Sequence, residues 1–272
     1  MRNQVLGLEE PVVMGVLNVT PDSFSDGGRF DRLDTAVTHA VAMREQGAVI
    51  IDIGGESTRP GADAVPADEE ISRVIPVVKQ LLQAAPGLVS VDTSKAPVMR
   101  AAITAGAHMI NDVAALRGTD ALQVCADSDV AVCLMHMKGT PRTMQQAPAY
   151  DDVVTEVRDF LGQRIEACRA AGIARERIVV DPGFGFGKAL EHNLALLRGL
   201  SQLCELGQPV LAGLSRKSML GQLLDRAVDE RLAGSLALAT LAVSGGASII
   251  RAHDVAATAD AVKVAAAVAG AR

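Results

Sequence analysis

Aromatic residues are scarce in this sequence. It contains no tryptophan, one tyrosine and five phenylalanines in 272 residues, and its formal net charge at pH 7 is −6. Proteins that bind nucleic acids or sugars commonly use basic stripes and aromatic platforms, so this composition gives little support for either kind of partner. We therefore expect the partners of this chain to be small molecules.

Cysteines are few as well, and their spacing gives no support for disulfides or metal sites. The chain has four of them, none in a CxxC pair, and all lie within apolar segments. Because disulfide frameworks and cysteine metal sites need paired cysteines, we interpret them as reduced core residues of a cytoplasmic protein. They are Cys125, Cys133, Cys168 and Cys204.

A convincing membrane segment is missing too. The first eleven residues lack a long apolar core, so a secretory signal is not expected. The stretch from Leu232 to Ile250 carries no charge, but Gly245 and Gly246 interrupt it, and serine and threonine residues dilute it. We expect this stretch to form an outer helix followed by a strand, with no contact to a membrane.

Nothing in the sequence divides the chain into parts. There is no linker rich in proline, glycine or serine and no short repeat. Since 49% of the 272 residues are hydrophobic, the chain can bury one large core, and we expect a single domain over residues 1–272. Two long polar loops rich in glycine and proline, at about residues 20–30 and 55–66, are expected to be mobile.

What the sequence does have is eight short runs rich in valine, isoleucine and leucine, separated by segments with helical spacing. Continuous apolar runs of this length are typical of strands buried on both faces. Eight such repeats, in a chain close to the roughly 250 residues usual for the fold, predict an α/β protein with a (β/α)8 TIM barrel. A doubly wound open sheet is the alternative, but it would use fewer strands and gather functional residues at one switch point. The runs cover residues 12–18, 48–55, 88–94, 108–113, 130–137, 178–185, 210–216 and 248–254.

Each run ends in polar or charged side chains. Because parallel barrels carry their active sites at the carboxyl ends of the strands, these endings define the candidate site. The residues are Asn18, Asp52, Asp92, Asn111, His136, Asp181, Lys217 and Arg251.

One group of endings is acidic or amide: Asp92, Asn111 and Asp181. Carboxylates and an amide in a dry pocket can accept the paired N–H donors of a flat heterocycle such as a pterin or guanine. A glycosidase acid and base pair is an alternative, although few aromatics are present to stack sugars. A carboxylate metal site, as in enolase-like barrels, is another. Asn111 fits heterocycle recognition better, because an amide can both donate and accept.

A second group is cationic and comprises Arg216, Lys217, Arg251 and His253. Barrels frequently place phosphate at the ends of strands seven and eight, so this group argues for a phosphorylated substrate. Arg251 and His253 stand two residues apart and are expected to face the same way and clamp one anion. The alternative for these two is a solvated ion pair with Asp254. We expect the acidic and cationic groups at opposite corners of one cavity.

The glycine-rich segment DPGFGFGK, residues 181–188, resembles a phosphate-binding loop only superficially. It lacks the upstream glycine of that motif and has Ala189 where serine or threonine should bind magnesium. We expect its glycines to turn the backbone tightly over a ligand, with Phe184 or Phe186 covering a ring.

The same strand endings belong to longer motifs. The motifs are NVTPDSFSDGG from Asn18, DIGGESTRPGA from Asp52, VDTSK with Asp92, IND from Ile110, MHMKGTP from Met135, DPGFGFGK from Asp181, LSRKS from Leu214 and RAHDV from Arg251. Together they resemble the motif set of the dihydropteroate synthase family, over the whole chain and with no departure at a position expected to be functional.

The resemblance implies a reaction. Members of this family couple 6-hydroxymethyl-7,8-dihydropterin pyrophosphate to p-aminobenzoate, which gives 7,8-dihydropteroate and pyrophosphate in folate biosynthesis. We expect SN1-like loss of pyrophosphate, since a carbocation on the hydroxymethyl carbon is delocalised into the pterin. The resemblance implies catalytic roles for Asp92, Asp181, Lys217 and Arg251.

The resemblance also implies the substrate contacts, residue by residue. The pterin site would comprise Asp92, Asn111, Met135, Asp181, Phe186 and Lys217. The pyrophosphate site would comprise Asn18, Thr58, Arg251 and His253, with Mg²⁺ near Asn18 and Asp22. The p-aminobenzoate site would comprise Phe24, Arg59, Pro60, Ser215 and Ser218. A homodimer is expected from the resemblance and from the smooth, alanine-rich outer helices near the C-terminus.

Two other functions compete with this one. The pterin- or folate-binding barrel of cobalamin-dependent methyltransferases has a similar pocket, but it should lack the anion clamp and the STRPG loop. A sugar-phosphate aldolase would use Lys217 as a Schiff-base amine, which needs a lowered lysine pKa. Neighbouring carboxylates would oppose that shift, whereas Arg216 would favour it.

Overall fold

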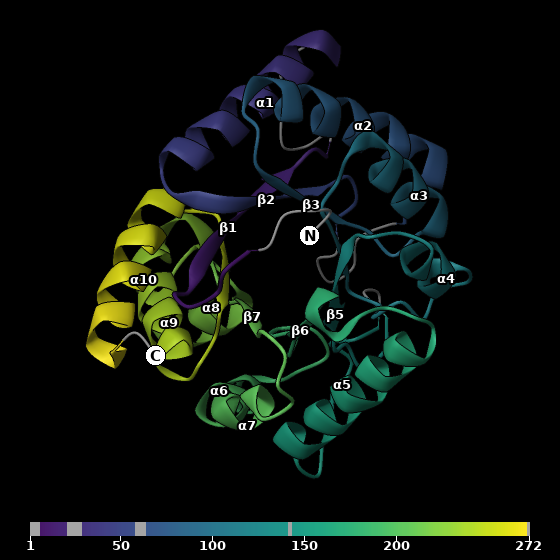
Figure 1. Cartoon of the computed structure of the whole chain (residues 1–272). Coiled ribbons are helices and arrows are strands. Elements are labelled where there is room, and N and C mark those ends of the chain that lie inside the picture. The colour runs from purple at the N-terminus through teal and green to yellow at the C-terminus, as the bar shows by residue number, and fades with distance from the viewer. Residues whose placement is uncertain (1–5, 21–28, 58–63, 141–142, 271–272) are drawn as a thin grey trace.

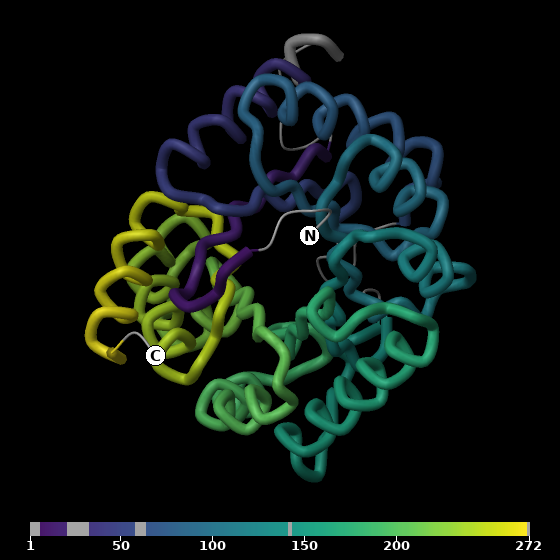
Figure 2. Tube along the Cα trace, in the orientation of Figure 1, coloured from purple at the N-terminus to yellow at the C-terminus, as the bar shows by residue number. Residues whose placement is uncertain are grey.

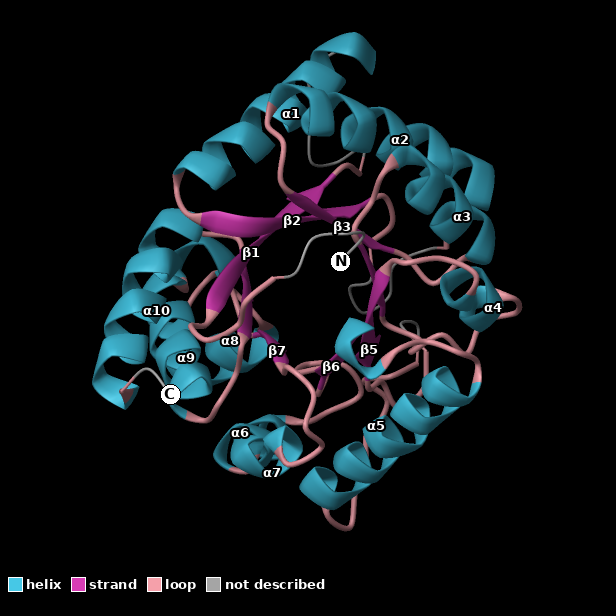
Figure 3. Cartoon of the chain, viewed as in Figure 1, coloured by secondary structure: helices cyan, strands magenta, loops and turns pink. Residues whose placement is uncertain are grey.

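The computed structural model describes residues 6–20, 29–57, 64–140 and 143–270. Eight parallel strands form an inner ring, and the helices lie outside it (Figures 1 and 3). The chain passes once around the ring in sequence order, from β1 to α10 (Figure 2). The strands are β1 (Val12–Asn18), β2 (Ala48–Gly54), β3 (Leu88–Asp92), β4 (Met109–Asp112), β5 (Ala131–Met135), β6 (Ile178–Asp181), β7 (Leu211–Gly213) and β8 (Ile249–Ala252).

A helical segment follows every strand. Single helices follow β1 to β5, two short helices follow β6, two helices follow β7, and the last follows β8. They are α1 (Arg29–Glu45), α2 (Ala67–Ala84), α3 (Ala96–Ala105), α4 (Ala121–Ala126), α5 (Val153–Ala170), α6 (Leu190–Arg198), α7 (Leu200–Cys204), α8 (Ser218–Leu224), α9 (Leu232–Ser244) and α10 (Val255–Ala269). Short 3-10 turns lie at Arg175–Arg177 and Val228–Glu230.

The strands close into a barrel. Their order is β6-β5-β4-β3-β2-β1-β8-β7, so strands that follow one another in sequence are paired, except β6 and β7, and β1 pairs with β8. The remaining seam, between β6 and β7, is joined by a parallel bridge from Val180 to Val210. This topology confirms the predicted (β/α)8 barrel and excludes the doubly wound alternative. The eight predicted runs contain the eight strands.

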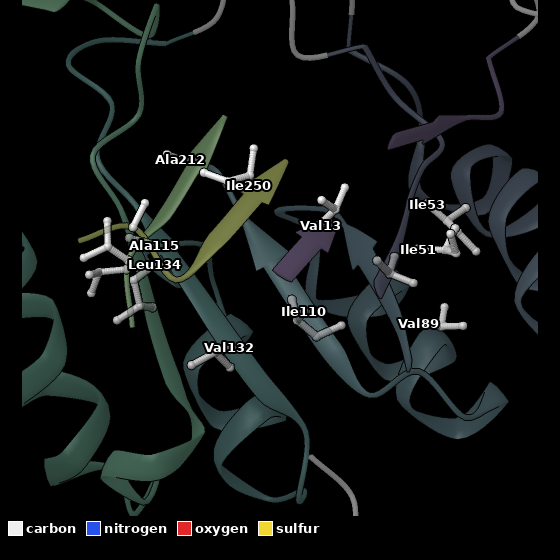
Figure 4. Packing of buried hydrophobic residues seen from close by; sticks show 14 of the residues in the cluster. Val13, Ile51, Ile53, Val89, Ile110, Ala115, Val132, Leu134, Ala212 and Ile250 are labelled. Atoms are coloured by element: carbon white, nitrogen blue, oxygen red, sulfur yellow. The ribbon is translucent and has the colours of Figure 1, made fainter. Parts of the chain in front are cut away.

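Two apolar layers hold the strands in place. Alternate side chains such as Ile51, Ile53 and Ile250 point outward and pack under the helices (Figure 4). The intervening side chains point inward and fill the lower part of the barrel, where Leu6 and Leu8 of the N-terminal segment pack against them. This inner layer consists of Met14, Ile50, Leu88, Met109, Ala131, Cys133, Val179, Leu211 and Ile249. The barrel floor is therefore closed, and only its upper mouth can hold a ligand.

The cysteines are free thiols, as predicted. Cys125, Cys133 and Cys168 are buried, whereas Cys204 is partly exposed. The uncharged stretch from Leu232 to Ile250 forms α9 and the start of β8, also as predicted. Among the described helices, none has the length and apolar character needed to cross a membrane.

Removing atoms from the outer layer should destabilise the barrel. Ile51 is fully buried under the helices, so we expect Ile51→Ala to lower the free energy of unfolding by about 2–5 kcal/mol. Val49 lies on the same strand but is 37% exposed, and Val49→Ala should cost about 1 kcal/mol or less. Urea unfolding followed by far-ultraviolet circular dichroism suits a chain without tryptophan. Equal losses for the two variants would contradict this packing.

Candidate active site

The alternation of strand side chains places the candidate residues on the inner face. On β2, Ile50 points into the barrel, and so does Asp52 two residues later. On five other strands, too, the candidate residue stands two or four positions after a side chain of the inner apolar layer and so points inward. The pairs are Leu88 and Asp92, with Ser90 between them, Met109 and Asn111, Cys133 and Met135, Val179 and Asp181, and Ile249 and Arg251. The candidate residues thus form a layer directly above the apolar floor.

An arginine held between two carboxylates lies at the centre of this layer. Arg251 Nε donates to Asp52 Oδ2 at 2.7 Å, and Arg251 Nη2 donates to Asp92 Oδ2 at 3.0 Å. Asp52 is fully buried, and the Arg251 side chain is 21% exposed. Burial alone would lower the pKa of Arg251, but the two carboxylates hold it above its ordinary value. We call Asp52, Arg251 and Asp92 the mouth triad.

Asp92 is an unusual carboxyl group. Burial raises its pKa to about 7, because desolvation and the neighbouring carboxylates outweigh the attraction of Arg251. Its second oxygen, Oδ1, is buried and has no hydrogen-bond partner. A buried acceptor without a donor is costly, so this atom is suited to an N–H group of a ligand.

Asn111 and Asn18 flank the mouth triad. Asn111 pairs with Asp92 in the β3–β4 register, and its Nδ2 donates to Asp52 Oδ2 at 3.1 Å. Gly54 at the end of β2 leaves space between two neighbours, since an added side-chain carbon there would lie 3.5 Å from Asn18 Oδ1 and 3.7 Å from Asp92 Cβ. The predicted pterin and pyrophosphate residues Asn111, Asp92 and Asn18 therefore lie on consecutive sides of one mouth.

Asp181 and Lys217 form the opposite side of the mouth. Burial raises the pKa of Asp181, and Lys217 and the Gly183 amide oppose that shift. Burial also lowers the pKa of Lys217 to about 8, against the attraction of Asp181. The cation that favours this lowering is Arg251, not Arg216 as expected from the sequence. Gly213 at the end of β7 leaves room for the ammonium group.

An apolar wall completes the pocket beside these charges. Met135 packs with Val113, Met137 and Met144, and Phe186 lies against this group. Lys217 Nζ lies 4.8 Å from the centroid of the Phe186 ring and donates to Phe184 O. Phe184 itself is fully buried in the outer core. Of the two phenylalanines that could cover a ligand ring, the structure leaves Phe186 in position to do so.

The residues after β7 and β8 contact each other. His253 Nδ1 lies 3.0 Å from Ser215 Oγ, and the His253 amide donates to the same oxygen at 3.2 Å. Asp254 pairs with Arg216, whose Nε donates to it at 2.9 Å. Arg251 binds Asp52 and Asp92 and not Asp254, so the alternative of an ion pair with Asp254 is wrong for this arginine. Ser218 is exposed at the first turn of α8.

The arrangement of charge differs from the sequence-based expectation in one respect. Acidic and cationic groups meet at one end of the barrel, but they do not occupy opposite corners of it. Arg251 contacts Asp92 directly, because β8 and β3 project their inner side chains toward the same point above the floor. The sequence could not show this contact, which joins residues far apart in the chain.

Five predicted site residues lie outside the described part of the chain. They are Asp22, Phe24, Thr58, Arg59 and Pro60. The two predicted mobile loops fall largely on the same segments, at residues 21–28 and 58–63.

Two residues important to the site were not among the predicted site residues. Asp52 was noted only as a strand ending, yet it binds both Arg251 and Asn111. Lys188 ends the glycine-rich segment and has no role predicted from the sequence, yet it is buried and donates to Gly183 O and Phe186 O. Strand alternation could have identified Asp52, since it follows the inward Ile50. His136 is buried beside Lys188, and its pKa is lowered to about 3 by burial and then by the lysine.

Comparison with known proteins gives consistent matches over nearly the whole chain. A family model described as "Pterin binding enzyme" matches residues 14–253. The dihydropteroate synthase of Escherichia coli K12 is 53% identical over 259 residues, which cover 95% of this chain and 92% of that protein.

Solved structures agree with the sequence matches. A Yersinia pestis dihydropteroate synthase in a sulfonamide drug complex has a TM-score of 0.94 and 51% identity, and the match covers 98% of this chain and 97% of that one. A Xanthomonas albilineans dihydropteroate synthase in complex with 7,8-dihydropteroate has a TM-score of 0.88 and 52% identity, covering 97% and 95% of the two chains.

The raised pKa of Asp92 predicts a pH-dependent stability cost. An unfolded chain ionises this carboxyl near its ordinary pKa of 3.8, whereas the folded chain keeps the proton up to about pH 7. The folded state therefore loses stability as the pH rises from about 4 to 7. Asp92→Asn cannot ionise, so its free energy of unfolding relative to wild type should rise across this window.

Chemical denaturation at several pH values measures this difference. The exposed Asp159 offers a matched control, because Asp159→Asn removes a carboxyl whose side chain is 60% exposed. A difference between Asp92→Asn and wild type that stays constant from pH 4 to 7 would show that burial does not hold the proton on Asp92.

Proposed function

The chain belongs to the family of pterin-binding enzymes, and on that basis we propose that it acts as a dihydropteroate synthase. It condenses 6-hydroxymethyl-7,8-dihydropterin pyrophosphate with p-aminobenzoate to give 7,8-dihydropteroate and pyrophosphate. The observation that carries the proposal is the buried Asp92 carboxyl, whose Oδ1 lacks a donor inside a mouth that also holds Asn111, Asp181 and Lys217. The relatives and solved structures described above are dihydropteroate synthases, which favours this reaction over the methyltransferase and aldolase alternatives.

The pterin ring fits the deep side of the mouth. Asp92 and Asp181 accept ring and amino N–H groups, Asn111 supplies an amide whose Nδ2 is already held by Asp52, and Lys217 donates to a ring acceptor. Met135 and Phe186 supply an apolar face on which the flat ring packs. A buried site that pairs acceptors with N–H groups selects strongly against rings that lack them.

The pyrophosphate group fits the outer side of the mouth. Arg251 is the partly exposed member of the mouth triad, and its Nη1 takes no part in the two ion pairs. The His253 ring is oriented by Ser215. Asn18 lies at the end of β1 beside these residues, and we assign Thr58 to the same group by its motif. Binding of a pyrophosphate here adds negative charge where a guanidinium is already fixed.

Magnesium fits this side of the mouth by the chemistry of the available donors. Asn18 offers an amide oxygen, and Asp22 would add a carboxylate; Mg²⁺ is commonly held by one or two such groups together with substrate phosphates. The described residues contain no cluster of three or more histidine, cysteine, aspartate or glutamate side chains that could hold a metal alone. The substrate would therefore complete the coordination. When bound, the ion neutralises charge on the pyrophosphate.

The mechanism follows from where the fixed charges lie. Arg251 and His253 stabilise the charge that develops on the departing pyrophosphate. As the C–O bond breaks, positive charge spreads from the hydroxymethyl carbon into the pterin, where the carboxylates of Asp92 and Asp181 favour it. The neutral arylamine of p-aminobenzoate then attacks that carbon and loses a proton. Lys217 keeps the ring oriented throughout, so positioning contributes more than proton transfer.

The p-aminobenzoate site lies at the rim. Ser215 and Ser218 belong to the segment after β7, next to the anion site. We assign Phe24, Arg59 and Pro60 to the same site by their motifs. The arginine would pair with the carboxylate of this substrate.

A homodimer is the proposed assembly. The outer helices α8, α9 and α10 lie together on one side of the barrel (Figure 1), where they expose large apolar side chains. The exposed residues are Leu223, Leu224, Leu232, Leu241, Val264 and Val268 on these helices and Val228 on the turn between α8 and α9. Several exposed large apolar side chains on neighbouring elements favour an interface with another chain. The four free thiols, three of them buried, also favour a reducing, cytoplasmic location.

The activity can be tested directly. The purified protein is incubated with the pterin pyrophosphate, p-aminobenzoate and Mg²⁺, and pyrophosphate release is measured together with dihydropteroate. We expect release that depends on both substrates and falls when EDTA removes divalent ions. Release without p-aminobenzoate at the same rate, or no product with both substrates present, would contradict the proposed reaction.

The assembly can be tested by light scattering after size exclusion. We expect a mass of twice the 28.3 kDa of one chain, and Leu241→Glu on α9 should reduce it toward the single chain. Arg100→Glu, on the exposed surface of α3, provides the control and should leave the mass unchanged. A wild-type mass equal to one chain would rule out the dimer.

A further inference from the structure

Five successive backbone carbonyls of the glycine-rich loop are each bound by a side chain. Lys188 Nζ donates to Gly183 O at 2.9 Å and to Phe186 O at 3.0 Å. Lys217 Nζ donates to Phe184 O, Gln145 Nε2 to Gly185 O at 2.6 Å, and Tyr150 Oη to Gly187 O at 2.7 Å. Loops commonly leave such groups to water. This loop, residues 183–187, is instead fixed by donors from several segments.

Lys188 is the most deeply buried of these donors. Its residue is only 3% exposed, and burial lowers its pKa well below the ordinary value. A buried ammonium is costly unless its donors are paired. Besides the two loop carbonyls, Lys188 Nζ lies 2.9 Å from His136 Nδ1 and 3.3 Å from His136 O. The ammonium group thus connects the loop after β6 to the end of β5.

His136 is suited to accept from this lysine. Burial and the charge of Lys188 lower the pKa of the histidine to about 3, so the ring is neutral at working pH. A neutral imidazole has one acceptor nitrogen, and the short contact to Lys188 assigns that role to Nδ1. The ring is further packed edge-on against Phe160, with centroids 4.9 Å apart. The anchor for the lysine is therefore rigid.

The loop lies so close to the end of β5 that two of its positions have no room for a side chain. Gly183 has φ +68°, and a side-chain carbon there would lie 2.0 Å from His136 O. Gly187 has φ +62°, and a carbon there would lie 2.4 Å from Lys138 O. Positive φ and close backbone approach both require glycine. With the backbone so confined, one buried cation can hold two of its carbonyls at once.

The loop carries Phe186 and is bound to Lys217, two of the residues assigned to the pterin site. Phe186 lies against Met135 and its neighbours, and Lys217 is tied to the loop through Phe184 O. Within the described part of the chain, Lys188 forms no hydrogen bond with the mouth triad, and its hydrogen bond to the apolar wall goes to a backbone carbonyl, that of Phe186. We propose that Lys188 is a positioning residue for the pterin site: its buried ammonium, anchored on His136, fixes the loop so that Phe186 and Lys217 meet the ring. This inference rests on the proposed function.

The test compares two lysine substitutions. Lys188→Met keeps the length of the side chain but removes every donor. Lys79→Met is the matched control, since Lys79 is an exposed lysine on α2 and makes none of the hydrogen bonds that fix the loop. We measure the Kd of the pterin pyrophosphate by calorimetry, the KM of p-aminobenzoate at saturating pterin, and amide hydrogen exchange of peptides covering residues 182–188.

For Lys188→Met we expect the pterin Kd to rise about tenfold to a hundredfold, because small displacements of positioned groups carry losses of this size. The KM of p-aminobenzoate should change little, and loop amides should exchange faster in the free protein. Lys79→Met should match wild type in all three measurements. A folded Lys188→Met protein with wild-type pterin Kd and wild-type loop exchange would overturn the proposal.

Tyr150→Phe keeps the proposal testable if Lys188→Met does not fold. It removes only the donor to Gly187 O from a partly exposed ring, and it should raise the pterin Kd and loop exchange in the same direction by a smaller factor. An unchanged Kd and exchange rate in that variant would count against the loop being held by its side chains. If the proposed function is wrong, the wild-type protein will not bind the pterin ester, whereas Lys188→Met will still speed amide exchange in the loop. This outcome differs from failure of the positioning role, in which the wild-type protein binds the ester and the variants behave like it.

Discussion

The ion pairs that Arg251 makes with Asp52 and Asp92 are the interaction on which the rest of this site depends. They join β8 to β2 and β3 across the mouth, directly above the apolar floor. A buried charge without a partner is strongly unfavourable, so each member of the mouth triad requires the others. The triad leaves Asp92 Oδ1 without a donor, and burial holds the pKa of this carboxyl near 7 against the attraction of Arg251. Without a ligand, the charge of Arg251 is therefore paired within the site, but the hydrogen-bonding capacity of Asp92 Oδ1 is not used.

A ligand with N–H donors at one end and negative charge at the other can bind both Asp92 and Arg251. The donors would satisfy the Asp92 oxygen, while the anion would meet the exposed part of Arg251. Both contacts lie directly above the apolar floor, where a lower dielectric constant than that of water strengthens them. On the other side of the mouth, the loop held by Lys188 presents Phe186 and Lys217 to the same ring. One wall is fixed by ion pairs and the other by donors to backbone carbonyls.

Much of this arrangement follows from the sequence. The apolar runs predict the strands, and a step of two residues from inward positions such as Ile50 or Ile249 predicts that Asp52 and Arg251 face the interior. The sequence does not predict which charges meet, because contacts such as Arg251 to Asp92 depend on the twist and register of the closed barrel. The role of Lys188 could not be predicted, because its partners are backbone carbonyls and one nitrogen of His136. Such contacts produce no recognisable pattern of residue types in the sequence.

The central claim is that the Asp92 carboxyl, held by Arg251, is the acceptor for the pterin ring. The most direct measurement is calorimetric titration of the pterin pyrophosphate into wild type and Asp92→Asn at the same pH. An amide in place of the carboxyl presents a donor where an acceptor is needed, and loss of such a contact in a buried site costs about 1–3 kcal/mol. The account predicts affinity weakened about tenfold or more in a variant that keeps the wild-type circular dichroism spectrum. A folded Asp92→Asn protein that binds the pterin ester as tightly as wild type would contradict it.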